Sequence, residues 1–264
     1  MKNSILRLVV VGATSTSLAS TASSQQAVQW RAEDGGNGHW YGLYIQPAVS
    51  WDQADQIART RNGHLCTITS LAESTWVWQN LASNPGAWRT DINFAGPHIG
   101  GTCDAGGQWS WVTGEPWVFV NAGSCFNAGL TGEGRLHFGC SALENRWNDI
   151  AAGDLNSGGF IVEWSADCND DGIVDYGQCI DGSLLDANLN HVPDQCECAV
   201  DPTLQACCPC DAFRDGFVNG IDLGMLLSQW GEVTKSTVTD FNRDGAVDGA
   251  DLGQLLAAWG PCPS

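Results

Sequence analysis

The stretch WDQADQIARTRNGHLCTITSLAE, residues 51–73, carries the clearest helix signals in the first part of the chain. Ser50 stands directly before apolar residues at helical spacing, and Gln53 completes a capping box with it, so we predict a helix from residue 51. Asn62–Gly63 ends that helix, because both residue types tolerate left-handed backbone angles. Ser70 begins a second helix in the same way, with a glutamate three residues later.

Short strand-like runs separated by glycine follow the two helices. They are His98–Gly100, Gln108–Val112, Trp117–Asn121, Gly134–Phe138 and Phe160–Trp164. Two helices followed by such strands, with no alternation of strand and helix, predict an α+β domain over residues 28–165.

The first 24 residues have the features of a secretory signal. Lys2 and Arg7 flank the start of an apolar run, Ile5–Ala13, and small residues continue to Ser24. The run is too short to span a bilayer, and no later segment is apolar enough to do so. We therefore expect residues 1–24 to be removed and the protein to be secreted or displayed on an extracellular surface, without a membrane span.

The cysteines and the charge agree with an exported protein. Twelve cysteines favour disulfides outside the cell, and the even number permits complete pairing. The run from Cys196 to Cys210 lacks a clean pair of CxxC units, so we favour bridges over a zinc site there. The net charge is −19, and 17 of the acidic residues follow Ala166. Such a surface repels nucleic acid, which we exclude as a partner.

The end of the chain contains the same segment twice. DAFRDGFVNGIDLGMLLSQWG starts at Asp211 and DFNRDGAVDGADLGQLLAAWG starts 29 residues later. In the second copy, oxygen side chains stand at positions 1, 3, 5, 9 and 12 of a calcium loop, with Gly245 at position 6. These candidate ligands are Asp240, Asn242, Asp244, Asp248 and Asp251. Phe213 takes position 3 of the first loop and leaves Asp211, Asp215, Asn219 and Asp222, so we expect weaker calcium binding there.

An apolar helix is predicted after each loop, over Leu223–Trp230 and Leu252–Trp259. Its apolar positions repeat with the same spacing in both copies, which predicts a core shared between the copies. These positions are Leu223, Leu226, Leu227 and Trp230, then Leu252, Leu255, Leu256 and Trp259. The segments before the loops, CCPC and EVTKSTVT, are poor helix formers, so each unit is a loop with only an exiting helix.

Two shorter acidic loops lie in residues 166–198. Both place oxygen side chains at alternate positions, which favours calcium over the alternative of a flexible acidic linker. The candidate ligands are Asp167, Asn169, Asp171 and Asp175 in DCNDDGIVD, and Asp186, Asn188, Asn190 and Asp194 in DANLNHVPD. His191 is interpreted as a spacer residue of the second loop.

Three known families resemble consecutive parts of this chain. Residues 28–165 resemble a C-type lectin-like domain, since the segment quoted first is followed in the family's order by HIGG, WSWVTGEP, WND and FIVEW. Residues 166–198 resemble thrombospondin type 3 repeats, and residues 207–264 resemble a dockerin. The resemblance implies an α+β lectin-like domain, an acidic calcium-binding spacer and a small all-α calcium-binding domain whose partner would be a cohesin-like protein.

The family resemblance also implies where cysteines have been lost. Ala58 and Val162 stand at the positions of the usual disulfide between the first helix and the last strand. Cys140 resembles the start of the second bridge, but its usual partner is missing. We favour Cys125 as the new partner of Cys140, although the sequence leaves other pairings open.

The resemblance further implies a sugar bound on Ca²⁺. Its ligands would be Asn148 and Asp149 of WND, Glu133, and Asn127 as the survivor of a Glu-Pro-Asn type triplet. Cys125–Phe126 replaces the carboxylate and the proline of that triplet. Glu115–Trp117 looks like the missing triplet but lies too early and is interpreted as structural. The alternative is that WND only packs the core and holds no calcium. Trp117 and Phe126 are the candidates for stacking on a sugar.

Two functions follow from these features. The first is a secreted, calcium-dependent, carbohydrate-binding lectin-like protein whose partner is a glycan or cell-surface polysaccharide, tethered or displayed through the tail. The alternative is a protein-binding adhesion module that has lost sugar binding. We expect no enzyme, because the carboxylate pairs needed for glycoside cleavage are abundant only in the calcium loops.

Overall fold

The computed structural model describes residues 23–24, 26–91, 95–127, 132–140, 142–186, 188–201, 207–231, 238–242 and 244–262. The predicted signal segment lies almost wholly outside these residues, as does most of EVTKSTVT. Within the described part of the chain, no helix combines the length and the apolar character needed to cross a bilayer.

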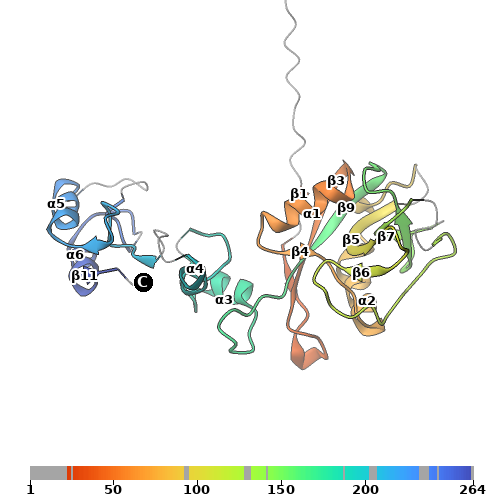
Figure 1. The fold of residues 1–264 in the computed structure, drawn as a ribbon, viewed down its shortest axis with the longest axis horizontal. Helices are drawn as coiled ribbons and strands as arrows, with labels where there is room; N and C mark the ends of the chain where they lie inside the picture. Colours follow the sequence, from red (N-terminus) through yellow and green to blue (C-terminus); the bar gives the residue numbers. More distant parts are fainter. Residues whose placement is uncertain are drawn as a thin grey trace, which may run out of the picture.

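A nine-stranded sheet forms the first part of the protein (Figure 1). Its central path runs in the order β1-β3-β9-β5-β7-β8, while β2 pairs with β3, β4 with β9 and β6 with β5. The strands are β1 (Ser23–Ser24), β2 (Val28–Gln29), β3 (Trp40–Val49), β4 (His64–Leu65), β5 (Ala95–Cys103), β6 (Trp109–Trp111), β7 (Arg135–Gly139), β8 (Trp147–Ile150) and β9 (Ser157–Trp164). The first long strand pairs with the last one from Trp40↔Trp164 onward, which closes the domain.

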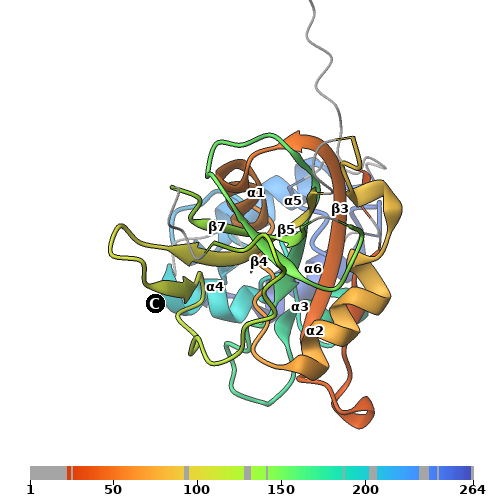
Figure 2. The same ribbon diagram turned by 90° about the vertical axis from the view of Figure 1, so that its right-hand side faces the viewer.

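The two predicted helices are present, as α1 (Trp51–Arg59) and α2 (Leu71–Val77). The capping box of Ser50 and Gln53 is confirmed, and the Ser70 side chain accepts the backbone N–H of Glu73. A π-helical turn, η2 (Trp78–Ala82), continues α2, and short 3-10 turns η1 (Ala32–Asp34) and η3 (Pro85–Ala87) complete this part. Figure 2 shows α2 alongside the long strand β3.

The core is split between the two faces of the sheet. Ile161 belongs to a cluster with Val77 of α2, whereas Phe160 and Val162 belong to a cluster with α1. Successive residues of β9 therefore face opposite sides, as the two-residue period of a strand requires. Ala58 and Val162, where the resemblance implies a disulfide, are both fully buried in the α1 cluster and contribute apolar packing there.

The longer strands β3 and β8 were not predicted, nor were the two-residue strands β1, β2 and β4, and one predicted strand does not form. β3 is buried on both faces for much of its length, so its sequence lacks the alternation that marks a strand. β8 is only four residues long. The run Trp117–Asn121 does alternate, with Val118 77% and Val120 44% exposed, yet it forms no strand because no neighbouring strand pairs with it.

The acidic segment is partly folded onto the sheet domain. It contains α3 (Asp175–Asp181) and α4 (Asp194–Val200). The Tyr176 ring stacks on Trp164 at 4.2 Å between centroids and also contacts Trp40 and His191. Asn62 donates a hydrogen bond of 2.8 Å to the carbonyl of Asn190. This segment therefore takes part in the aromatic packing at the end of β9.

We expect Tyr176→Ala to destabilise the sheet domain by about 2 kcal/mol, because it removes a ring that packs on two tryptophans. Thermal unfolding followed by tryptophan fluorescence measures this directly. Tyr176→Phe keeps the ring and should remain close to wild type. An unchanged melting temperature in Tyr176→Ala would show that this packing contributes nothing to stability.

The tail consists of two loop-and-helix units, with α5 (Gly220–Ser228) and α6 (Gly249–Ala257). Both helices begin three residues earlier than predicted, because Asn219 and Asp248 cap them with full capping boxes. The tail is not purely helical, since β10 (Phe217–Val218) pairs with β11 (Gly260–Pro261).

The predicted shared core of the tail is only half correct. Leu226 and Leu255 are fully buried together, and Leu223 and Leu252 pack against them. The remaining apolar positions lie between 47% and 55% exposed; they are Leu227, Trp230, Leu256 and Trp259. Leu227 and Leu256 lie beside the buried leucines, whereas Trp230 and Trp259 lie two residues beyond the ends of α5 and α6. We call these four residues the exposed apolar stripe of the tail.

Candidate functional site

The four predicted sugar-site residues lie around the β7–β8 hairpin. Asn148 and Asp149 are on β8, opposite His137 and Leu136 of β7. Glu133 stands two residues before β7 begins. The hairpin therefore sets the spacing of three of the four residues, and the preceding loop supplies Asn127.

Asn127 connects the members of the site. Its backbone N–H donates to Asp149 Oδ1 at 3.0 Å, and its side-chain amide donates to Glu133 Oε2 at 2.7 Å. Both carboxylates thus accept hydrogen bonds from the same asparagine. The residues that the sequence placed at one site are adjacent in the fold.

A buried histidine that the sequence did not single out orients Asn148. The Phe138 carbonyl can only accept, so the 2.7 Å contact assigns the hydrogen of His137 to Nδ1. Burial lowers the pKa of His137 to about 4, so the ring is neutral and its Nε2 accepts from the Asn148 amide at 3.5 Å. The same amide donates to the Asp149 carbonyl at 2.9 Å.

These contacts leave one oxygen of the site without a hydrogen-bond donor. Asn148 Oδ1 is buried and has no partner among the described residues. A buried acceptor without a partner is costly, and a cation can supply the missing interaction. Two carboxylates and two amide oxygens are ligands of the kind that Ca²⁺ prefers. The residues present therefore fit a calcium ion.

The aromatic residues beside the site are packed on one another. Phe126 contacts Trp109 at 5.4 Å between ring centroids, and Trp109 stacks on Trp117 at 5.6 Å. Trp117 also contacts Trp111, which meets Trp147 of WND edge to face. Trp117 and Phe126, the candidates for sugar stacking, thus form part of a continuous aromatic layer beneath the site.

Glu115, which begins the look-alike triplet, has a structural role. Its carboxylate accepts hydrogen bonds from the Thr67 hydroxyl at 2.6 Å and from the Thr113 hydroxyl at 2.8 Å. These bonds tie the start of the long loop to the residues after β4. The interpretation of this triplet as structural is consistent with these contacts.

A buried network of carboxylates lies next to Glu115 and was not predicted. Glu163 accepts from His39 Nδ1 at 2.6 Å and from the Thr67 N–H at 2.8 Å. Glu73 accepts from the Tyr41 hydroxyl at 2.7 Å and from the Thr69 N–H at 2.7 Å. Both glutamates are almost fully buried. Only the fold brings these residues together, because they come from four separate segments.

His39 and Glu73 are among the groups whose pKa values rise in this network. Burial alone would lower the pKa of His39, but the hydrogen bond and charge of Glu163 outweigh it and raise the pKa above 6.5. Burial and the charge of Glu163 raise the pKa of Glu73 above 4.5. Both groups bind protons more tightly in the folded state. Their stabilising contribution is complete below the unfolded pKa values and is lost as the pH rises through the folded ones.

The substitution His39→Gln tests whether the stabilising contribution of His39 falls as the pH rises. At about pH 6, wild type should exceed the variant in free energy of unfolding by about 1 kcal/mol, because protonated His39 then bonds to the Glu163 carboxylate. As the pH rises through the folded-state pKa of His39, the ring becomes neutral and the difference should shrink by about pH 9 or above. Denaturant unfolding at both pH values measures it, and a difference that does not change with pH would contradict the assignment.

The four predicted calcium loops share one hydrogen-bond frame. In each, the first aspartate accepts the backbone N–H of position 6 at 2.8–3.0 Å; these residues are Asp167, Asp186, Asp211 and Asp240. Position 6 has a positive φ in every loop and is glycine in three of them. In the second linker loop it is His191, with φ 67°, whose ring lies on Tyr176.

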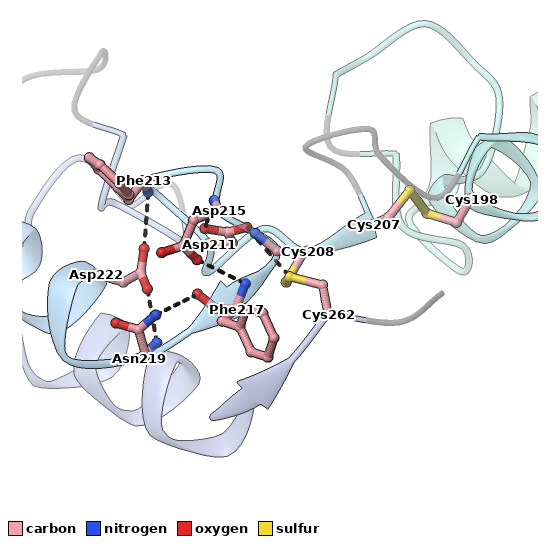
Figure 3. The surroundings of a disulfide bond; sticks show 11 residues. Cys198, Cys207, Cys208, Asp211, Phe213, Asp215, Phe217, Asn219, Asp222 and Cys262 are labelled. Carbon is pink, nitrogen blue, oxygen red and sulfur yellow. Dashed lines mark hydrogen bonds between the residues drawn. A yellow bond between two sulfur atoms is a disulfide. The ribbon is translucent and has the colours of Figure 1, made fainter.

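Figure 3 shows this frame in the first loop of the tail. Asp211 accepts from Asp215 and Gly216, while Asp222 accepts from Phe213 and Asn219. The Phe213 ring contributes no oxygen at position 3. In the second loop, one oxygen of Asp240, Oδ1, is buried without a hydrogen-bond partner among the described residues. The second loop thus offers an open acceptor that suits a cation.

Disulfides join the loops to their surroundings. The structure joins Cys125 to Cys140, the pairing that we favoured, and it also forms Cys168–Cys196, Cys198–Cys207 and Cys208–Cys262. Four cysteines are free thiols, so the pairing is not complete; they are Cys66, Cys103, Cys179 and Cys210. The run from Cys196 to Cys210 is used mainly for bridges, as expected.

Comparison with known proteins supports a C-type lectin-like domain. No protein-family model matches the chain. The chain is 27% identical over 130 residues to asialoglycoprotein receptor 1 of Mus musculus, a match that covers 46% of this chain and 39% of the receptor. It is 28% identical over 148 residues to C-type lectin domain family 10 member A of Homo sapiens, covering 52% and 40%. The chain thus covers less than half the length of these relatives.

Solved structures of similar outline include the cow C-type carbohydrate-recognition domain of CD23, with 22% identity, TM-score 0.40, and coverage of 50% of this chain and 91% of that one. The C-type lectin domain of murine dendritic cell inhibitory receptor 2, solved with an N-glycan, has 19% identity, TM-score 0.40, and coverage of 49% and 92%. Similarity at this level carries no inference about what the present chain binds.

Proposed function

We propose that this chain is an exported lectin-like protein that binds carbohydrate through Ca²⁺ held by Asn127, Glu133, Asn148 and Asp149. The observation that carries the proposal is the convergence of these residues, with two direct hydrogen bonds from Asn127 and a buried, unpartnered Asn148 oxygen. The relatives named as a receptor and a C-type lectin support the same class of function. Asparagine side chains can donate to a hydroxyl while their oxygens face a cation.

Calcium bound here would supply a Lewis-acidic point at which two vicinal sugar hydroxyls coordinate. The protein's own part is to hold two carboxylates at fixed spacing and to present amide donors beside them. Cys125 occupies the place of a further carboxylate and is bonded to Cys140, so it offers no oxygen. We therefore propose calcium binding that is weaker than a complete ligand set would give.

The test is glycan-array binding of the full-length protein with calcium and with chelator. Binding that disappears with chelator and returns with calcium supports the proposal. Glycan binding that is unchanged by chelator would contradict the role of calcium. Binding to no glycan at all would contradict the proposed carbohydrate-binding function.

A second candidate function is protein adhesion without sugar. The observation in its favour is the long loop around Val118 and Val120, where both apolar side chains face solvent beside a site that has lost one carboxylate. Chelator-resistant capture of a protein partner, lost in Val118→Ser/Val120→Ser, would favour this function over the lectin.

We further propose that the protein is exported by residues 1–24 and tethered by residues 207–264, with residues 166–198 as the calcium-binding spacer between them and the lectin-like domain. The exposed apolar stripe of the tail supports a docking role, for which a cohesin-like protein is the proposed partner. A quadruple variant should abolish capture by such a partner, while the buried Leu226 and Leu255 keep the tail folded. It carries Leu227→Ser, Trp230→Ser, Leu256→Ser and Trp259→Ser.

A further inference from the structure

The loop that carries Asn127 is fixed to the β7–β8 hairpin at every second residue. Asn121 and Gly123 exchange hydrogen bonds with the Trp147 backbone at 2.9 and 2.7 Å, Cys125 forms a disulfide with Cys140, and Asn127 donates to Asp149 at 3.0 Å. Phe126, between the last two of these points, packs on Trp109. The path of the loop into the site therefore depends on a series of anchors.

The disulfide is the anchor closest to Asn127 that does not depend on the site itself. Cys140 follows β7 directly, and β7 pairs with β8, which carries Asn148 and Asp149. The bridge thus links the loop covalently to the hairpin that holds the other ligands. Cys140 is buried, whereas Cys125 is exposed. The backbone N–H of Cys125 also donates to Cys140 Sγ at 2.9 Å.

The hydrogen-bonded anchor at Asn127 itself can exchange with water. The Asn127–Asp149 hydrogen bond is only partly buried, and a partly exposed hydrogen bond competes with solvent. A Glu-Pro-Asn type triplet restricts its own backbone through proline. In this chain the proline position is Phe126, which places no such restriction on its backbone.

We propose that the Cys125–Cys140 disulfide is the positioning element of the sugar site, holding Asn127 against Asp149 and Glu133 where a proline would otherwise set the turn. The inference rests on the proposed function for its ligand, and on the anchors described above for its geometry. The disulfide acts through Asn127 and does not itself touch calcium or sugar.

The test uses the full-length protein with Cys125→Ala/Cys140→Ala. Hydrogen exchange at the Asn127 amide should accelerate at least about ten-fold, while amides of the paired strands β7 and β8 keep their protection. Affinity for a glycan that the wild type binds should fall at least about ten-fold. Cys208→Ala/Cys262→Ala removes a bridge of the tail and serves as the matched control, with no change in either measurement.

A rescue variant separates positioning from general stability. Cys125→Glu/Phe126→Pro/Cys140→Ala lacks the bridge but restores the triplet, and should recover both Asn127 protection and glycan affinity. Asn127 protection that survives loss of the bridge would overturn the inference, as would equal loss of protection over Asn127, β7 and β8. If the wild type binds no glycan but loss of the bridge still frees Asn127 selectively, the positioning role stands and the proposed function fails.

Discussion

Asp149→Ala is expected to abolish calcium-dependent glycan binding by the full-length protein, lowering affinity about a hundred-fold or more. The substitution removes a charged ligand of the proposed calcium site and also the acceptor of the Asn127 N–H, so two interactions are lost. Asp149 is almost fully buried. Glycan affinity at fixed calcium, measured for a sugar found by array, gives the result.

Two further substitutions make this result specific. Asp149→Asn keeps an oxygen that can accept from Asn127 but removes the charge, so it should bind glycan more weakly than wild type and more strongly than alanine. Asp91→Ala removes an exposed carboxylate that forms an ion pair with Arg89, and it should leave glycan binding unchanged. Full glycan binding by Asp149→Ala would exclude the proposed calcium site.

Local signals explain which elements the sequence could predict. The capping box at Ser50 spans four residues and the loop pattern before α5 and α6 spans twelve, so short stretches of sequence contain all the information needed. The alternation at Trp117–Asn121 was equally local, but a strand also requires a partner strand, which the sequence around it could not show. The strand β3 was missed for the opposite reason, because burial on both faces removes the alternation of polar and apolar residues that marks a strand.

In the candidate site, too, local patterns could be predicted and contacts between distant segments could not. Asn127, Glu133, Asn148 and Asp149 were found from a family pattern, and their adjacency follows from one hairpin and one loop. His137, which orients Asn148, gave no signal because a single histidine in a strand has no distinctive spacing. The network of Glu73, Glu163 and His39 is assembled from distant segments, and its formation depends on the pairing of β3, β4 and β9.

The tail illustrates how a repeat can mislead. The apolar positions of the two copies match letter for letter, which suggested that all of them pack together. The structure buries Leu226 and Leu255, whereas Leu227 and Leu256 are about half exposed and Trp230 and Trp259 lie beyond the ends of the two helices. Equal spacing in the sequence thus identified the helices correctly and overestimated their core.

The same repeat yields the second prediction of large effect, which concerns calcium in the two tail loops. We expect the second loop to bind calcium more tightly than the first, because it has a side-chain oxygen at position 3 where the first loop has Phe213. Asp240→Ala should therefore abolish the higher-affinity site and Asp211→Ala the lower-affinity one. With calcium at about a thousand times its dissociation constant, binding contributes about 4 kcal/mol to stability. Chelation should therefore lower the melting temperature of wild type strongly, and of Asp240→Ala much less.

Phe213→Asp supplies the missing ligand and should strengthen calcium binding at the first loop about ten-fold, since it adds both an oxygen and a charge at position 3. Phe217→Asp is the matched control: it adds the same charge to the same loop at position 7, where the backbone carbonyl is the expected ligand. Both rings are about equally exposed, at 57% and 53%, so neither substitution empties a core. Calorimetric titration of the full-length protein compares the two. Equal gains would show that net charge governs affinity, and no gain from Phe213→Asp would mean that the first loop does not bind calcium in the proposed geometry.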